Sequence, residues 1–342
     1  MTNEDIKKIV DSTEYDFLRT NEHLKDKIIF LTLGGSHAYG TNIETSDVDI
    51  RGCALNRPSD LIGLTSFEQV VNERTDTTIY SFNKLINLLL NCNPNVIELL
   101  GCKPEHYLMV TDIGKELLNN RKLFLSKKAA YSFGGYANQQ LRRLENALAR
   151  DSYPQAEKER HILGSCMSAM MNFGEKYTSF SDGSIKLYID KSNHEDLVSE
   201  IFADINLLHY PLRDYKNIWS DMNNIIKDYG KLNKRNHKKD NAHLNKHAMH
   251  LIRLYLMCLD VLEKEQIITY RENDHDLLMD IRSGAYQKED GTYRREFFDM
   301  VNDFEKRLSY AKDNTSLPDK PNMQLVEEFV MSVNRRALNE QD

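Results

Sequence analysis

The sequence predicts an α+β protein with a small α/β domain over residues 1–110 and a larger all-helical domain over residues 111–342. Three observations support this prediction. The length of 342 residues suggests two domains rather than one. Short runs rich in β-branched and aromatic residues occur before residue 83, where strands are therefore expected. After Pro104 the hydrophobic pattern is almost wholly helical.

The elements of the N-terminal domain are expected in the following order. Residues 4–24 have the spacing of an amphipathic helix. Strands are expected at 27–34, 48–55 and 75–82, with a hairpin partner at 68–73. Residues 83–93 then form a helix, which Asn93-Pro94-Asn95 interrupts because the residue before a proline disfavours helical geometry. The domain would be a short mixed sheet with helices on one face.

The C-terminal domain is expected to consist of helices joined by short connections. Helices are predicted over 113–122, 127–150, 155–180, 195–209, 213–230, 242–264, 272–283, 293–313 and 322–339. Linker-like stretches lie at 151–154 and 313–321. No apolar run approaches the roughly 18 residues of a membrane span, so we expect no membrane partner.

Charge and cysteine content limit the classes of function. The net charge of −7 gives no overall nucleic-acid footprint, so any basic site must be local. The five cysteines are scattered and lack metal-binding spacing; they are Cys53, Cys92, Cys102, Cys166 and Cys258. Reduced thiols and an acidic N-terminus without a secretory segment favour a cytoplasmic protein.

Two carboxylates stand two residues apart where the second strand is expected. On a strand, Asp47 and Asp49 would face the same side and repel each other unless cations neutralise them. Hard oxygen ligands suit Mg²⁺, and a pair of Mg²⁺ ions about 3.5–4 Å apart serves in-line displacement at phosphorus. Taken alone, however, an Asp-x-Asp pair is better explained as a solvated strand end.

A glycine-rich turn precedes these carboxylates. Gly34 and Gly35 would let backbone N–H groups approach a phosphate, and the hydroxyl of Ser36 adds a donor. A helix that begins near Ser36 would direct its N-terminus at the same anion. Taken alone, this turn is also explained as an ordinary strand-to-helix connection.

Together, in this order and spacing, the two motifs resemble the polymerase-beta superfamily of nucleotidyltransferases. Residues 34–52 are similar to its stand-alone bacterial and phage group, with Gly-Ser-x-x-Tyr-Gly followed by Ser-Asp-x-Asp-x-x-Gly. The matching residues are Gly35, Ser36, Tyr39, Gly40, Ser46, Asp47, Asp49 and Gly52. Less specific similarities to the group occur at 76–100, 131–144, 246–262, 277–286 and 317–333.

The resemblance implies transfer of a nucleoside monophosphate from an NTP to an acceptor hydroxyl, with release of pyrophosphate. Gly34, Gly35 and Ser36 would hold the triphosphate. Asp47 and Asp49 would ligate two Mg²⁺ (or Mn²⁺) ions per site.

The superfamily adds a third carboxylate on a neighbouring strand, and Asp76 is the residue we expect in this role. Asp76 would help to ligate the ion that activates the acceptor. Glu73 and Glu68 are the alternatives.

Other residues near the motif receive structural interpretations. Arg51 is expected to form a salt bridge, and Tyr39 to pack under the loop. His37 is expected to be an exposed bystander.

Basic residues gather in the helical half. The segment 231–247 is dense in Lys, Arg and His, and either binds phosphates or is a charged loop. One helical stripe then holds His243, Lys246, His247, His250 and Arg253. This stripe either lines a phosphate-bearing cleft or is solvated. With the resemblance, we expect Lys246 and Arg253 to face outward and bind the NTP.

The acceptor is not readable from the sequence. The acidic net charge favours a small molecule or a protein, and an RNA end stays open. Two other classes of function also stay open: a nucleotide-binding regulator that keeps the fold, and an antitoxin or defence component that acts through a protein partner. The presence of Asp47, Asp49 and Asp76 argues against a regulator, since binding alone does not need all three.

Overall fold

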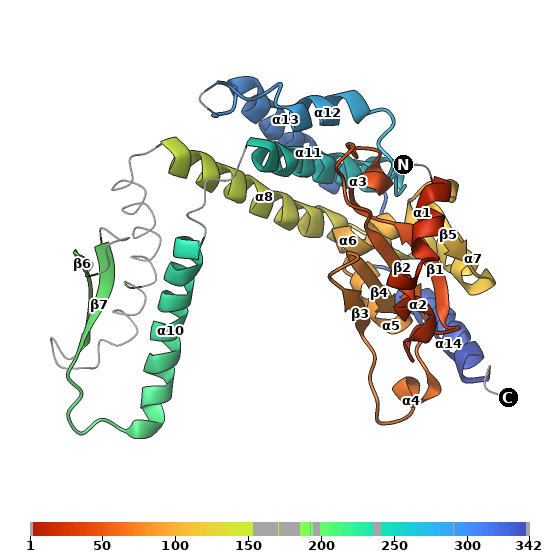
Figure 1. Ribbon diagram of the computed structural model, residues 1–342, viewed down its shortest axis with the longest axis horizontal. Coiled ribbons are helices and arrows are strands. Elements are labelled where there is room, and N and C mark those ends of the chain that lie inside the picture. The colour runs from red at the N-terminus through yellow and green to blue at the C-terminus, as the bar shows by residue number, and fades with distance from the viewer. Residues whose placement is uncertain are drawn as a thin grey trace. The chain divides into compact units, whose positions relative to one another are not determined.

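A computed structural model describes most of the chain (Figure 1). The described residues are 3–152, 170, 185–191, 193, 199–234, 241–289 and 291–339. The chain forms two compact units. The first unit contains residues 1–143, 245–288 and 293–342, and the second contains 144–244 and 289–292.

A five-stranded mixed sheet lies at the centre of the first unit. Its strands are β1 (Ile28–Leu33), β2 (Ile50–Ala54), β3 (Gln69–Asn72), β4 (Thr77–Ser81) and β5 (Tyr107–Val110), in the order β3-β4-β2-β1-β5. Strands β2 and β4 are parallel, and the other pairs are antiparallel. The apolar strands β1 and β2 are almost entirely buried. Because β2 and β4 run the same way, the residues that precede them meet at one edge of the sheet.

Helices from both ends of the sequence complete the first unit. The N-terminal ones are α1 (Asn3–Val10), α2 (Phe17–Thr20), α3 (Gly35–Tyr39), α4 (Pro58–Leu61), α5 (Phe82–Leu89), α6 (Pro94–Ile97) and α7 (Asp112–Asn119). The later ones are α8 (Lys128–Ser152), α11 (Asn241–Lys264), α12 (His275–Ser283), α13 (Arg295–Asn314) and α14 (Met323–Asn339). Helices α11 and α13 lie side by side (Figure 1), and the rings of Tyr255 and Phe304 stack with centroids 5.9 Å apart.

The C-terminal helices pack directly on the α/β region. The ring of Phe329 in α14 meets Phe82 in α5 at 6.1 Å between centroids, and Asn334 donates to Asn83 at 3.1 Å. The compact units therefore do not divide after residue 110, because helices from the C-terminal part bury their apolar faces against the sheet domain. The functional division into 1–110 and 111–342 stays a prediction.

The second unit combines two strands with a long helix. Strands β6 (Ile185–Lys191) and β7 (Ser199–Ile205) pair antiparallel, and α10 (Leu212–Lys234) contributes the buried Ile218 and Ile225. The helix predicted over 195–209 is therefore wrong. Residues 199–205 instead form β7, which pairs with β6. Strand preference depends on such pairing more than on the local sequence pattern. Apart from Met170, the helix predicted over 155–180 lies outside the described residues.

The remaining sequence predictions agree in outline with the fold. The α+β class, the mixed sheet and the helical C-terminal region are confirmed, whereas β5 and β6 were not predicted. Within the described ranges, no helix is both long and apolar enough to cross a membrane. The cysteines that the structure describes are free thiols, and Cys166 lies outside the described residues.

Replacement of Phe329 by alanine tests the packing of α14. Phe329 is 7% exposed, so the change leaves a cavity beside Phe82. We expect a loss of about 3–5 kcal/mol in the free energy of unfolding, measured by urea denaturation. Tyr310→Ala in α13 is the control, because Tyr310 is 70% exposed and its loss should cost under about 0.5 kcal/mol. Equal effects of the two changes would contradict the described packing.

Candidate active site

The turn between β1 and α3 needs glycine because other residues pack against its backbone. Gly35 has φ +54°, and a Cβ atom there would lie 1.7 Å from Oδ2 of Asp49. The N–H of Gly34 donates to the Asp49 carbonyl at 2.8 Å, and a Cβ atom at Gly34 would lie 2.9 Å from Cγ of Arg51. The turn that carries Ser36 is therefore in direct contact with the carboxylate segment.

The parallel strands β2 and β4 bring two carboxylates together. Ile50 pairs with Thr77, so Asp49 and Asp76 stand next to each other just before the two strands begin. Asp76 has φ +42°, a left-handed conformation that aspartate tolerates better than most residues. The alternatives for the third carboxylate do not take this place: Glu68 pairs with Lys84 at 2.9 Å, and Glu73 is exposed at the start of the turn that Asp76 ends.

The Asp49 and Asp76 carboxyl groups share a hydrogen bond and compete for one proton. Burial, followed by this hydrogen bond, raises the pKa of Asp49 to about 7. The same hydrogen bond lowers the pKa of the more exposed Asp76. The pair therefore holds its shared proton on Asp49 up to near-neutral pH.

Arg51 contacts both carboxylates and so forms the salt bridge that was predicted for it. Its Nη2 donates to Oδ1 of Asp76 at 2.9 Å and to Oδ1 of Asp49 at 3.2 Å. Its Nη1 donates to the carbonyl groups of Ile50 and Asp76. The guanidinium favours the ionised form of both acids, and its charge lowers the pKa of each.

Asp47 is not gathered with the other two carboxylates. It is exposed, and residues 46–49 precede β2 rather than form part of the strand. In the part of the chain that the structure describes, no group of three or more His, Cys, Asp or Glu side chains is arranged to hold a metal ion. The expected face shared by Asp47 and Asp49 on a strand is therefore not formed.

The two neighbouring carboxylates nevertheless fit a hard divalent cation. Each carboxyl group shifts the pKa of the other, so the two lie close enough for a cation between them to relieve their repulsion. Carboxylate oxygens are the donors that Mg²⁺ and Mn²⁺ prefer. Asp49 and Asp76 would thus hold such an ion.

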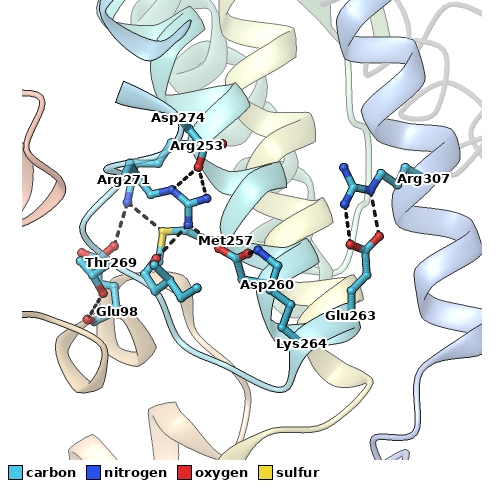
Figure 2. Close-up of polar contacts among 11 residues, drawn as sticks. Glu98, Arg253, Met257, Asp260, Glu263, Lys264, Thr269, Arg271, Asp274 and Arg307 are labelled. Carbon is cyan, nitrogen blue, oxygen red and sulfur yellow. Dashed lines mark hydrogen bonds and ion pairs between the residues drawn. The ribbon is translucent and has the colours of Figure 1, made fainter. Parts of the chain in front are cut away.

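The cationic stripe of α11 is divided between the surface and the interior. Lys246 is exposed, and its charge lowers the pKa of both Asp49 and Asp76, so it lies on the side of the carboxylates. Arg253 is only 5% exposed. Its Nη1 donates to Oε2 of Glu98 at 3.0 Å (Figure 2), and its guanidinium lies 3.6 Å from the centre of the Tyr39 ring.

The outward-facing position predicted for Arg253 is therefore wrong. Helix α11 is buried on most of its surface, and the buried Glu98 neutralises Arg253 there. Tyr39 is packed under the loop as expected, at 3% exposure. His37, expected to be exposed, is buried, and burial lowers its pKa. Residues 235–240 of the basic segment lie outside the described residues.

Two further contacts of the loop were not anticipated from sequence. Glu98 contacts Tyr39 and Arg253, and Arg282 in α12 donates to the Thr41 carbonyl at 2.6 Å. The signal for Glu98 was present, because a lone acid within the apolar run Val96–Leu100 requires a buried partner. Nothing local indicates Arg282.

The mixed sheet, the glycine turn and the neighbouring carboxylates agree with the polymerase-beta-like class of fold. Residues 6–171 match a family model described as the RNA repair pathway DNA polymerase beta family. The match includes β1–β5 and all three acids, Asp47, Asp49 and Asp76. Comparisons of the chain with curated proteins and with solved structures gave no match.

The raised pKa of Asp49 predicts how its replacement changes stability. A protonated Asp49 contributes stability that is complete below its unfolded value near 3.8 and is lost as the pH rises through about 7. Asparagine does not ionise, so Asp49→Asn should unfold at a higher temperature than the wild type at pH 8 in chelator. The advantage should shrink towards pH 4.

Asp47→Asn is the matched control for this measurement. Asp47 is exposed two residues away, so thermal unfolding of this variant should follow the wild type across the same pH range. An Asp49→Asn protein that is less stable than the wild type at pH 8 would contradict the described carboxylate pair.

Proposed function

We propose that the chain transfers a nucleoside monophosphate from an NTP to an acceptor hydroxyl and releases pyrophosphate. One observation above all supports this proposal: Asp49 lies against the Gly35 turn and beside Asp76. They lie in a segment that matches a polymerase beta family.

The glycine turn is the proposed triphosphate site. The N–H groups of Gly35 and Ser36, at the start of α3, and the Ser36 hydroxyl would bind the β- and γ-phosphates. The Gly34 N–H already donates to the Asp49 carbonyl, so Gly34 would shape the turn rather than bind phosphate. Lys246 is exposed on the carboxylate side and would add a positive charge. Arg253 has no direct phosphate contact in this proposal, since Glu98 already pairs with it.

The acids would hold Mg²⁺ or Mn²⁺ and handle the proton of the acceptor. Asp49 and Asp76 are the proposed ligands, and two ions per site is the expectation. Asp47, which is exposed, would have to turn towards them to serve as a further ligand. When bound, such ions supply the positive charge that stabilises the reacting phosphate. Asp76 has a lowered pKa and is the more exposed of the pair, so it is the proposed acceptor of the proton from the attacking hydroxyl.

The acceptor that we propose is the terminal hydroxyl of an RNA strand. The family that residues 6–171 match is described by its place in RNA repair, and this description supports RNA more directly than the acidic net charge supports a small molecule or a protein.

A transfer assay tests the proposal. The protein is incubated with each radiolabelled NTP, Mg²⁺ or Mn²⁺, and an RNA that ends in a 3′-hydroxyl; a matched RNA with a 3′-phosphate is the control acceptor. We expect label on the first RNA only, together with pyrophosphate, and no label in excess chelator or with the Asp47→Asn, Asp49→Asn double variant.

Other outcomes of this assay would overturn parts of the proposal. Metabolite and protein fractions of a cell extract are offered as further acceptors in parallel reactions. Label on one of these fractions, with none on RNA, would refute the RNA acceptor. Absence of transfer to every acceptor, or full transfer in chelator, would refute the reaction as proposed.

Asp76→Asn should affect turnover more than nucleotide binding. If Asp76 serves the acceptor side, its loss should lower kcat by about 10²–10³, with a smaller change in KM for the NTP. Glu73→Gln is the matched control, because Glu73 is an exposed carboxylate in the same turn. A near-normal kcat for Asp76→Asn, with a low kcat for Glu73→Gln, would move the role to Glu73.

A further inference from the structure

We infer that Tyr39, Glu98 and Arg253 form a buried clamp that positions the Gly35–Ser36 turn for the reaction. This inference rests on the proposed function for its kinetic consequence, and on the structure alone for the clamp itself. The three residues are positioning residues in this account, since none of them is placed to touch the reacting groups.

The clamp is closed by three mutual contacts. Tyr39 Oη donates to Oε1 of Glu98 at 2.7 Å, and Arg253 Nη1 donates to Oε2 of the same carboxylate at 3.0 Å. The guanidinium of Arg253 lies 3.6 Å from the centre of the Tyr39 ring, within the range of a cation–π contact. Each side chain therefore contacts the other two.

Burial makes this arrangement selective for one geometry. Tyr39, Glu98 and Arg253 are each at most 6% exposed. A buried ion pair adds little stability compared with an apolar core, but it tolerates few alternative arrangements because each charge must keep its partner. The Thr269 hydroxyl also donates to the Glu98 carbonyl at 2.5 Å, which fixes the backbone of the central residue. A positional role explains why such a costly pair lies here.

Residues 270–282 hold the backbone from Tyr39 to Thr41. The N–H of Arg271 donates to the Tyr39 carbonyl at 3.0 Å, and Arg282 donates to the Thr41 carbonyl at 2.6 Å. Between them, Gly40 has φ +74°, and a Cβ atom there would lie 2.5 Å from the Tyr270 ring. Three successive residues are thus fixed by residues 270–282, which lie beyond the family match at 6–171.

The short helix α3 links the clamp to the carboxylates. It contains only residues Gly35–Tyr39, so the clamped end and the turn beside Asp49 belong to one helical segment. A shift of Tyr39 would therefore move Ser36 and Gly35 relative to Asp49. Misplacement of a reacting group by about 1 Å can reduce a rate about a hundredfold. The C-terminal helices would thus act on catalysis through the position of the loop.

A matched pair of tyrosine variants tests the clamp. Tyr39→Phe removes the hydrogen bond to Glu98. Tyr255→Phe is the control, because Tyr255 is also buried and its hydroxyl bonds a glutamate, Glu305, at 3.1 Å. Arg253→Met and Arg253→Lys complete the set. Hydrogen exchange of the full chain, read by mass spectrometry, reports on residues 34–46, and kcat and KM for the NTP report on the reaction.

The expected result is a change confined to the loop. Arg253→Met should speed exchange over residues 34–46 and lower kcat about ten- to a hundredfold, with a smaller change in KM. Tyr39→Phe should also speed exchange over residues 34–46 and lower kcat, each by a smaller amount than Arg253→Met. Arg253→Lys should recover part of kcat, because lysine keeps the charge but not the planar stacking. Tyr255→Phe should match the wild type over these residues and in kcat.

The inference fails if Tyr39→Phe and Tyr255→Phe show the same exchange over residues 34–46 and the same kcat. Should Arg253→Met not fold, the tyrosine pair still decides, since each variant loses one hydroxyl group. Should the wild type transfer to no acceptor, the exchange measurement alone decides on the clamp. Loop exchange that changes in a protein without transfer activity would uphold the clamp and refute the proposed reaction.

Discussion

The repulsion between Asp49 and Asp76 is the constraint on which the first unit depends. Parallel pairing of β2 and β4 places the two acids together, and burial of Asp49 makes their shared charge costly. Arg51 and the shared proton offset that cost in the protein alone. The glycine at position 35 is needed because Oδ2 of Asp49 occupies the space of a side chain. The strand order, the glycine in the turn and the neighbouring charges are therefore all linked through the position of Asp49.

The C-terminal helices extend this arrangement rather than form a separate layer. Helix α11 supplies Lys246 on the carboxylate side and Arg253 beneath the loop, and α12 supplies Arg282 to the Thr41 carbonyl. Residues far beyond the family match therefore support the turn that the match contains. The buried Glu98 links the two parts of the sequence, because it contacts both Tyr39 and Arg253. The same reaction site thus depends on both ends of the chain.

Local pattern was sufficient where the structure is local. The strands at residues 28–33, 50–54 and 77–81 follow from runs rich in β-branched and aromatic residues, and the turn follows from glycine placement. The choice of Asp76 followed from the family resemblance. Pairing over long range could not be read in this way. Helical periodicity placed Arg253 on the same stripe as Lys246. The partner of Arg253, Glu98, lies 155 residues earlier, so the local sequence could not indicate that Arg253 is buried. Strand β7 was missed for a different reason: it pairs with the neighbouring β6, and strand preference depends on such a partner more than on the local pattern.

Binding of Mn²⁺ to the metal-free protein tests the central claim most directly. Isothermal titration at pH 8 and pH 6 would compare the wild type with the Asp49→Asn, Asp76→Asn double variant. The account predicts binding by the wild type that weakens at pH 6, because the proton on Asp49 competes with the ion below a pKa of about 7, and loss of binding in the double variant. Wild-type affinity in the double variant, or affinity independent of pH, would contradict it.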